Sequence, residues 1–177
     1  KFSSDEQGFL YDKEKTILVC LPDAIVGSVT IPESVTEIRE FAAAECASVS
    51  QIHFPESLEK IQPFAFFACT NLRTVQLPKS VTFVGSSAFA ACSSLQTISV
   101  DSENTKFSAD TYGVLYDKDK TALCAAPGAI RSYTIPDGVR KIGSYAFSYC
   151  TKLSEIKIPD SVTAIHTYAF NGCSKLK

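Results

Sequence analysis

The chain has 177 residues, of which 45% are hydrophobic and 20% charged, a balance typical of one globular domain. Its formal net charge is −2, so it lacks the basic surface of a nucleic-acid-binding protein and any polybasic attraction to an anionic membrane. No apolar run reaches the roughly 20 residues that a helix needs to cross a bilayer. We therefore expect no nucleic-acid partner and no membrane insertion of this segment.

The first thirty residues contain an element that returns later in the chain. Residues 8–18 read GFLYDKEKTIL and residues 113–123 read GVLYDKDKTAL, and each pair of equivalent positions is 105 residues apart. In each copy, two short apolar runs flank a four-residue polar turn, which predicts a β-hairpin. Asp12 and Asp117 begin these turns, where an Asp side chain can accept hydrogen bonds from the backbone that follows.

Residues 31–99 are built from a repeat of 23 residues. Pro32, Pro55 and Pro78 are 23 residues apart, and so are Pro136 and Pro159 farther on. The same spacing relates several other columns, and agreement of many columns on one period decides the fold class. The cysteine column is Cys46, Cys69, Cys92, Cys150 and Cys173, and the phenylalanine column is Phe66, Phe89, Phe147 and Phe170, with Ala43 in the first repeat.

Each repeat predicts one turn of a solenoid. In residues 74–77, strand alternation puts Val75 and Leu77 inward and Thr74 and Gln76 outward, and the following proline ends the strand. Residues 80–84 form a second, shorter extended piece on the other side of the coil. Residues 86–92 form a compact turn or short helix that carries Phe89 inward. Stacked turns bury a continuous core, with equivalent strands side by side in a parallel sheet.

Two columns of aromatic residues bear on packing and on recognition. Ala43 interrupts the phenylalanine column, so we expect it to mark the weakest turn unless Phe41 or the first hairpin fills the space. A neighbouring column contains Phe41, Phe64, Tyr145 and Tyr168, with Ser87 as its exception. Packing of these rings against the next turn is the favoured interpretation, and exposed anchors for a partner are the alternative.

The repeats predict a single domain over residues 1–177. It comprises a hairpin-containing unit at 1–30, three repeats at 31–99, a hairpin-containing long unit at 100–134, and the last repeats at 135–177, where the pattern stops within a unit. Because solenoids need polar capping units at their ends, we expect the chain to be a portion of a longer protein.

These motifs resemble the BspA-like leucine-rich repeat family. The resemblance is carried by Ile-Pro-Glu-Ser-Val-Thr-Glu-Ile at 31–38, by Ile-Pro-Asp-Ser-Val-Thr-Ala-Ile at 158–165, and by the Ala-Phe-x-x-Cys segments that end at Cys69, Cys92, Cys150 and Cys173. It covers nearly the whole chain. It implies a surface-exposed or secreted protein of a bacterium or parasitic protist, often one that adheres to host cells, matrix proteins or other microbes. The fold expected is α/β but mostly β: a right-handed leucine-rich-repeat solenoid, horseshoe-like, with one parallel sheet, short helical turns and two β-hairpin insertions.

The seven cysteines favour a ladder of small buried thiols over a metal site. There is no Cys-x-x-Cys pair, which zinc sites usually contain. Disulfides between adjacent turns are the alternative, although the total is odd and every turn has the same residue. Cys20 and Cys124 lie outside the column and are the expected reactive thiols, if any are reactive.

No other constellation predicts catalysis, a metal or a cofactor. His53 lies on the outward side of a strand and His166 on a different side of the coil, so a paired role is improbable. The chain has no phosphate-binding glycine loop, nucleophile elbow or His-Glu-x-x-His. The stretch Asp101-Ser102-Glu103-Asn104 could offer oxygens to calcium, but it lacks the spacing of a calcium loop, so a solvated turn is favoured.

The outward face of the sheet is the candidate binding surface. A hydrated sheet face with no ligand is the simpler interpretation, because alternation alone predicts polar outward residues. The functional hypothesis is a non-catalytic protein-binding module that contacts a host or microbial surface or matrix protein; the alternative is a structural spacer or stalk that presents another domain. The candidate ligand-binding residues are Gln51, His53, Thr74, Gln76, Thr97, Ser99, Ser132, Thr134, Glu155 and Lys157.

Overall fold

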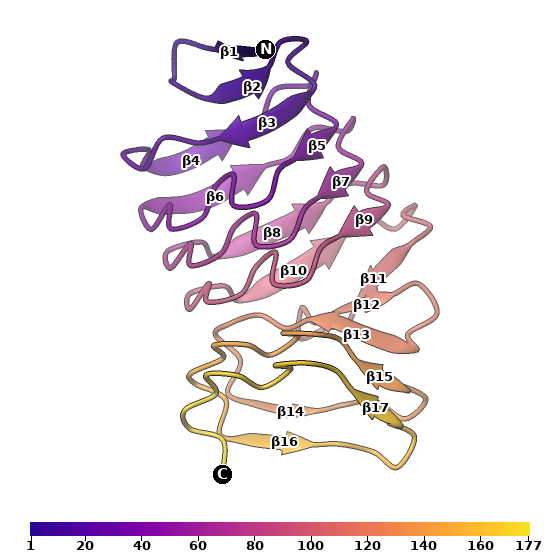
Figure 1. Cartoon of the computed structure of the whole chain (residues 1–177). Helices are drawn as coiled ribbons and strands as arrows, with labels where there is room; N and C mark the ends of the chain where they lie inside the picture. Colours follow the sequence, from indigo (N-terminus) through magenta and orange to yellow (C-terminus); the bar gives the residue numbers. More distant parts are fainter.

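The structure is a computed structural model that describes every residue from Lys1 to Lys177. Figure 1 shows a solenoid whose turns stack from the N-terminal to the C-terminal end of the chain. Each regular repeat contributes a longer strand to one row of strands and a shorter strand to a second row, as the repeat predicts. The solenoid and its parallel pairing are therefore confirmed.

The longer strands form the first row, with every neighbouring pair parallel. The register places equivalent repeat positions side by side, with Thr97 opposite Thr74 and Gln51 opposite Thr74. In β8, Thr74 and Gln76 are exposed while Val75 and Leu77 are buried, which confirms the predicted alternation. The row comprises a four-stranded sheet of β4 (Gly27–Thr30), β6 (Val49–His53), β8 (Thr74–Leu77) and β10 (Thr97–Val100), and a two-stranded sheet of β14 (Ser132–Thr134) and β16 (Glu155–Lys157).

The shorter strands form a second row, so the expectation of one parallel sheet is incomplete. The run from Ser80 to Val84 contains one of these strands, and its backbone pairs with the equivalent run of the preceding repeat. Both rows are interrupted near residue 100, and the chain has four sheets in all. The parallel strands of the second row are β3 (Ile17–Cys20), β5 (Glu37–Ile38), β7 (Lys60–Ile61) and β9 (Phe83–Val84), followed by β13 (Ala122–Ala125), β15 (Lys141–Ile142) and β17 (Ala164–Ile165).

Both predicted hairpins are present, and each is extended by a third strand. β2 (Leu10–Asp12) pairs antiparallel with β3, and β12 (Leu115–Asp117) pairs antiparallel with β13. β1 (Phe2–Ser4) and β11 (Phe107–Ala109) then add antiparallel edges to these hairpins. The second meander runs between β10 and β14 in Figure 1 and separates the two parts of the first row.

The predicted short helical turns are absent. The backbone N–H groups of Phe64, Phe66 and Ala68 donate to carbonyls of the next turn, while those of Ala65, Phe67 and Cys69 bond within their own turn. This alternation cannot coexist with an α-helix, in which every N–H donates to the carbonyl four residues before it. Two residues per turn also have positive φ, 57° at Phe64 and 58° at Ala68, which ends any right-handed helical run.

The phenylalanine column forms the centre of the core. Phe66 and Phe89 stack with centroids 5.5 Å apart and rings 5° from parallel, and Phe147 stacks on Phe170 at 5.2 Å. Beside the gap left by Ala43, Phe41 is 53% exposed and does not fill the space. Phe54, from the end of β6, instead packs 5.5 Å from Phe66.

The core divides where the long unit interrupts the solenoid. One cluster of 28 buried residues runs from Phe9 to Leu115, and a second cluster of 13 runs from Val114 to Ala169. The two parts remain joined by backbone and side-chain bonds: Ala129 N donates to Leu95 O at 2.9 Å and Lys152 Nζ to Ser93 O at 3.1 Å. The long unit is thus a full turn of the solenoid, but its buried residues are divided between the two core clusters.

Candidate functional site

The outward face of β6, β8 and β10 forms a hollow of about 350 Å³. Parallel pairing in register puts side chains of equivalent repeat positions next to each other across the strands, so their polar groups converge. All six candidate residues from these strands line the hollow: Gln51, His53, Thr74, Gln76, Thr97 and Ser99.

The other four candidate residues lie in a separate hollow of about 260 Å³ on β14 and β16. Ser132 lies opposite Glu155 and Thr134 opposite Lys157 in the parallel register. The structure therefore brings the ten residues together as a group of six and a group of four.

A loop at residues 110–113 separates the two hollows. Gly113 O accepts a hydrogen bond from Ile98 N, so this loop takes the place of the next strand beside β10. A Cβ at Gly113 would lie 2.5 Å from the Cα of Thr97, and only glycine fits without a shift. Tyr112, which is 65% exposed, packs its ring 5.7 Å from Tyr133 and lines the second hollow.

Buried polar groups hold the 110–113 loop in place. Asp110 Oδ1 accepts hydrogen bonds from Tyr112 N and Val114 N, each at 2.9 Å. Its Oδ2 accepts from the hydroxyl of Tyr133, which in turn is bonded to the hydroxyl of Tyr116. Burial raises the pKa of Tyr116 to about 12, so these phenols stay protonated and able to donate near neutral pH.

The first hairpin repeats this arrangement in simpler form. Asp5 Oδ1 accepts from Gln7 N and Phe9 N, and its Oδ2 accepts from the Tyr11 hydroxyl at 2.8 Å. The two Asp-x-x-Gly segments, at 5–8 and 110–113, are 105 residues apart like the hairpins themselves. The shared spacing of these two segments is the sequence signal that could have predicted the position of the 110–113 loop.

Seven further residues line the hollows although they were not among the candidates, and three of them, Ile52, Val75 and Tyr133, are buried. Phe54, Glu56 and Pro78 line the first hollow, and Tyr112 the second. Phe54, Glu56 and Pro78 lie just beyond the ends of β6 and β8, where strand alternation does not predict which way a side chain points.

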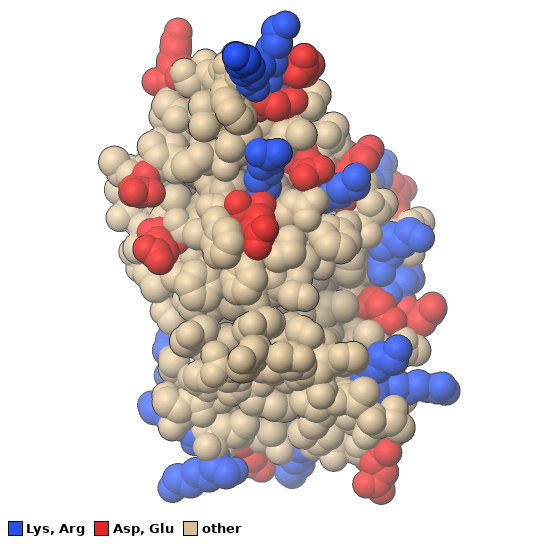
Figure 2. Space-filling view, viewed as in Figure 1, with Lys and Arg blue, Asp and Glu red and all other residues tan.

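The candidate surface carries few charges. His53 and Glu56 are the ionisable residues of the first hollow, and Glu155 and Lys157 those of the second. In Figure 2, charged side chains lie at both ends, along both edges and in the upper middle of the face in view, and a broad area just below the middle carries none. The geometry favours recognition by shape and neutral hydrogen bonding over attraction to a strongly charged ligand.

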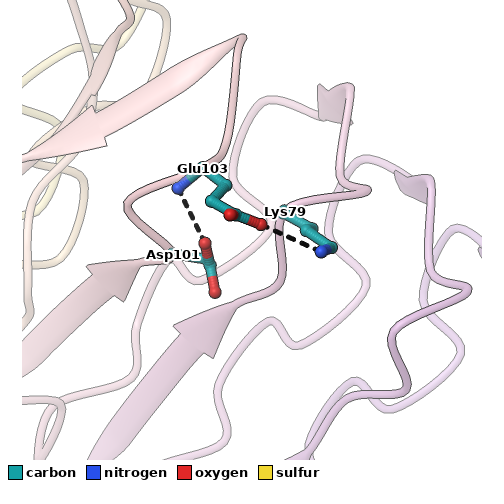
Figure 3. Close-up of polar contacts among 3 residues, drawn as sticks. All are labelled: Lys79, Asp101 and Glu103. Carbon is teal, nitrogen blue, oxygen red and sulfur yellow. Dashed lines mark hydrogen bonds and ion pairs between the residues drawn. The ribbon is translucent and has the colours of Figure 1, made fainter.

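The acidic stretch after β10 is a turn fastened by its own side chains. Asp101 Oδ1 accepts from Glu103 N at 2.8 Å, and Glu103 forms an ion pair with Lys79 at 2.9 Å, as Figure 3 shows. Asn104 is fully buried, so the expectation of a solvated turn is wrong at this residue. No group of three or more His, Cys, Asp or Glu side chains is positioned to hold a metal ion.

The cysteine column forms the predicted ladder of buried thiols. Cys46, Cys69, Cys92 and Cys150 are buried, Cys173 is half-buried, and all seven cysteines are free. Cys69 Sγ donates to Ala43 O at 3.0 Å and Cys92 Sγ to Phe66 O at 3.1 Å, so each thiol ties its turn to the preceding one. Burial raises the pKa of Cys46 to about 12, which leaves almost no reactive thiolate at neutral pH.

Thiol labelling of the native protein should separate these cysteines. We expect Cys20, which is exposed, to react fastest with a maleimide, and Cys69 and Cys92 to react only after unfolding. Cys124 is half-buried and its pKa is raised to about 12 by burial, so it should react more slowly than Cys20. Mass spectrometry of peptides after timed labelling measures each rate, and rapid modification of Cys69 or Cys92 in the folded protein would contradict the ladder.

The chain matches a known repeat family over most of its length. The family described as "BspA type Leucine rich repeat region" matches residues 23–113 and 123–177, with six copies of the repeat. No curated protein sequence matches the chain at a significant level. No segment of the structure forms a helix with the length and apolar character required to cross a membrane.

Several solved structures share this fold. A leucine-rich cell surface protein from Faecalibacterium prausnitzii is 35% identical, with a TM-score of 0.75, and the match covers 85% of this chain and 40% of that protein. The pneumococcal vaccine antigen PcpA is 29% identical, with a TM-score of 0.75, over 85% of this chain and 38% of PcpA. A leucine-rich repeat protein from Eubacterium ventriosum is 26% identical, with a TM-score of 0.67, over 89% of this chain and 51% of its own. The chain thus spans about two fifths to one half of each of these proteins.

Proposed function

Because the chain belongs to the BspA-type leucine-rich repeat family, we propose that it is a non-catalytic protein-binding module of a cell-surface or secreted protein, which adheres to a host or microbial surface or matrix protein. Solenoids of this kind commonly bind partners on an extended strand face. The similarity to a bacterial cell surface protein and to a pneumococcal vaccine antigen supports the proposed location.

One observation carries the proposal: six polar side chains from three adjacent strands converge on one hollow. The strands are fixed by parallel pairing and by buried residues on their inner side, so the hollow is preformed. A partner that enters it loses little free energy to ordering of the surface, which favours affinity from a small contact area. Phe54 adds an apolar contact at the rim, next to neutral hydrogen-bonding groups.

A pair of charge substitutions in the hollow tests the proposal. We expect Gln51→Arg combined with Thr74→Arg to weaken binding at least about tenfold, because two long cations would fill a hollow shaped for neutral groups. The measurement is retention on an array of host matrix proteins and microbial surface proteins, followed by titration of the proteins retained.

The matched control places the same charges elsewhere. Ser102→Arg combined with Thr105→Arg changes the net charge equally at two exposed positions outside both hollows, and should leave binding unchanged. Equal retention of both double variants by every bound protein would show that the hollow is not the docking surface.

A structural spacer remains the second candidate function, and the joint between the two core clusters favours it. Bonds from Ala129 N to Leu95 O and from Lys152 Nζ to Ser93 O bridge the interruption, so the solenoid can act as one stiff body. A spacer would bind no protein on the array.

A further inference from the structure

A second concave surface lies on the turns of the solenoid, away from the strand face. We call it the aromatic groove; its volume is about 270 Å³. It is lined by Phe64, Phe67, Tyr145, Tyr149 and Tyr168. Ser87, Ser148 and Asn171 complete the lining, and none of the eight residues carries a charge.

The groove exists because the aromatic column is interrupted. Phe41 stacks on Phe64 at 5.1 Å and Tyr145 packs on Tyr168 at 5.2 Å, but Ser87 takes the aromatic position between them. The next turn is the long unit, whose small residues at 124–128 pass beside both neighbours: Ala126 N donates to Ala146 O, and Gly128 lies against Cys92 O. The ring of Phe64 therefore meets that of Tyr145 edge-on at 5.8 Å, and the small side chain of Ser87 lines the groove with them.

Two hydroxyl groups at the groove lack partners. Ser87 is 8% exposed and Ser148 is 3% exposed, and the Oγ of each is buried without a hydrogen bond. A buried hydroxyl without a partner costs about 1–3 kcal/mol. Both serines line the groove, so a ligand there that supplies hydrogen-bonding groups would remove this cost.

The rings are held by an unusual backbone. Phe64, Tyr145, Tyr149 and Tyr168 all have φ between 57° and 60°, a conformation that bulky residues seldom adopt. A Cβ at Gly172 would lie 2.7 Å from Cδ1 of Tyr149, so only glycine leaves room for that ring. Positive φ recurs at this position in each regular turn, including Phe41 and Ser87, so the repeat backbone itself fixes the rings and preorganises them for a ligand.

From these features we propose that the aromatic groove binds a proline-rich peptide segment of a partner protein in the polyproline II conformation. Such segments dock in aromatic-lined grooves, where proline rings pack on aromatic rings. Their backbone carbonyls point outward and unbonded, and prolines have no N–H, so the ligand needs hydrogen-bond donors. The serine and tyrosine hydroxyls and the Asn171 amide are such donors, and no carboxylate lines the groove to repel a carbonyl.

The chain itself offers no occupant for this site. Its eight prolines are separated along the sequence, so no segment of residues 1–177 has the run of prolines that the groove would bind. The proposal is independent of the strand-face hollow, which lies on β6, β8 and β10. Failure of one proposal therefore leaves the other standing.

Decaproline is the probe for this site. In a titration of the isotope-labelled protein, we expect NMR shift changes at the amides of residues 64–68, 87 and 145–149. Tyr149→Ala should weaken the binding about tenfold, since buried aromatic contacts dominate such sites. The matched control is Tyr112→Ala, which removes an exposed tyrosine outside the groove and should leave decaproline binding unchanged.

Ser148→Ala separates a binding role from a structural one. Loss of an unpaired hydroxyl should leave the melting temperature unchanged or higher, and should weaken decaproline binding about threefold to tenfold, the worth of one hydrogen bond. The proposal is overturned if decaproline shifts no amide signal of the groove, or if Tyr149→Ala binds decaproline as well as the parent does. It is also overturned if these amide signals shift only with an oligosaccharide such as cellohexaose, or only with protein concentration.

Discussion

Replacement of Phe66 by alanine should destabilise the domain by about 3–5 kcal/mol, the usual cost of deleting a fully buried phenylalanine. Phe66 has no exposed surface and contacts two other rings, Phe89 at 5.5 Å and Phe54 at 5.5 Å. Because its turn is hydrogen-bonded to both neighbours, the backbone cannot collapse into the cavity. Urea unfolding followed by far-UV circular dichroism measures the loss.

The matched control is Phe83→Ala, which deletes the same side chain at a position that is 44% exposed. Since much of this ring already faces water, its removal should cost well under half as much as the core substitution. Equal losses at the two positions would mean that the stacked phenylalanine column is not what stabilises the solenoid.

The repeat period predicted most of the fold because each column faces the same environment in every turn. The cysteine and phenylalanine columns follow from burial, the proline column from its place at the end of a strand, and the alternation of Thr74 to Leu77 from a strand with one buried side. The turn at 86–92 was misjudged in part, since a short helix was among its predicted forms. Its backbone hydrogen bonds join one turn to the next, and the sequence of a single repeat does not show bonds between turns.

The candidate site was predicted by residue but not by shape. Strand alternation identified polar outward side chains on β6 to β16, and the structure places them in two hollows. The division arises from the 110–113 loop, whose position depends on Asp110 bonding to Tyr133 and on Gly113 packing against Thr97. These are contacts between different turns, so periodicity alone could not show them.

The aromatic column illustrates the same limit. The interpretation as packing is confirmed where Phe41 and Phe64 stack on each other, while Phe41 and Tyr168 are 53% and 59% exposed, and their role as anchors for a partner stays a prediction. A ring that packs on its neighbour along the solenoid axis can still present its edge to solvent. Whether such a column makes a ridge or a groove depends on its exception, Ser87, which lines the groove.

Asn104 shows how the long unit joins the regular repeats. It is fully buried, and its Nδ2 donates to Pro78 O at 3.0 Å and to Val81 O at 2.9 Å in the preceding turn. Its Oδ1 accepts from Lys106 N and Phe107 N, both at 2.8 Å, which directs the chain into β11. One side chain thus satisfies four backbone groups where the repeat pattern departs from its period.

We expect Asn104→Ala to destabilise the domain by about 4 kcal/mol, because four backbone groups, two of them in buried bonds, each lose a partner worth about 1 kcal/mol. Asn104→Asp should also destabilise it, since the carboxylate keeps the two accepted bonds but faces the carbonyls of Pro78 and Val81. Asn71→Ala, at an exposed position, is the control and should change the free energy of unfolding by less than about 0.5 kcal/mol. If Asn104→Ala unfolds at the same urea concentration as the parent, water replaces the side chain and the junction does not depend on it.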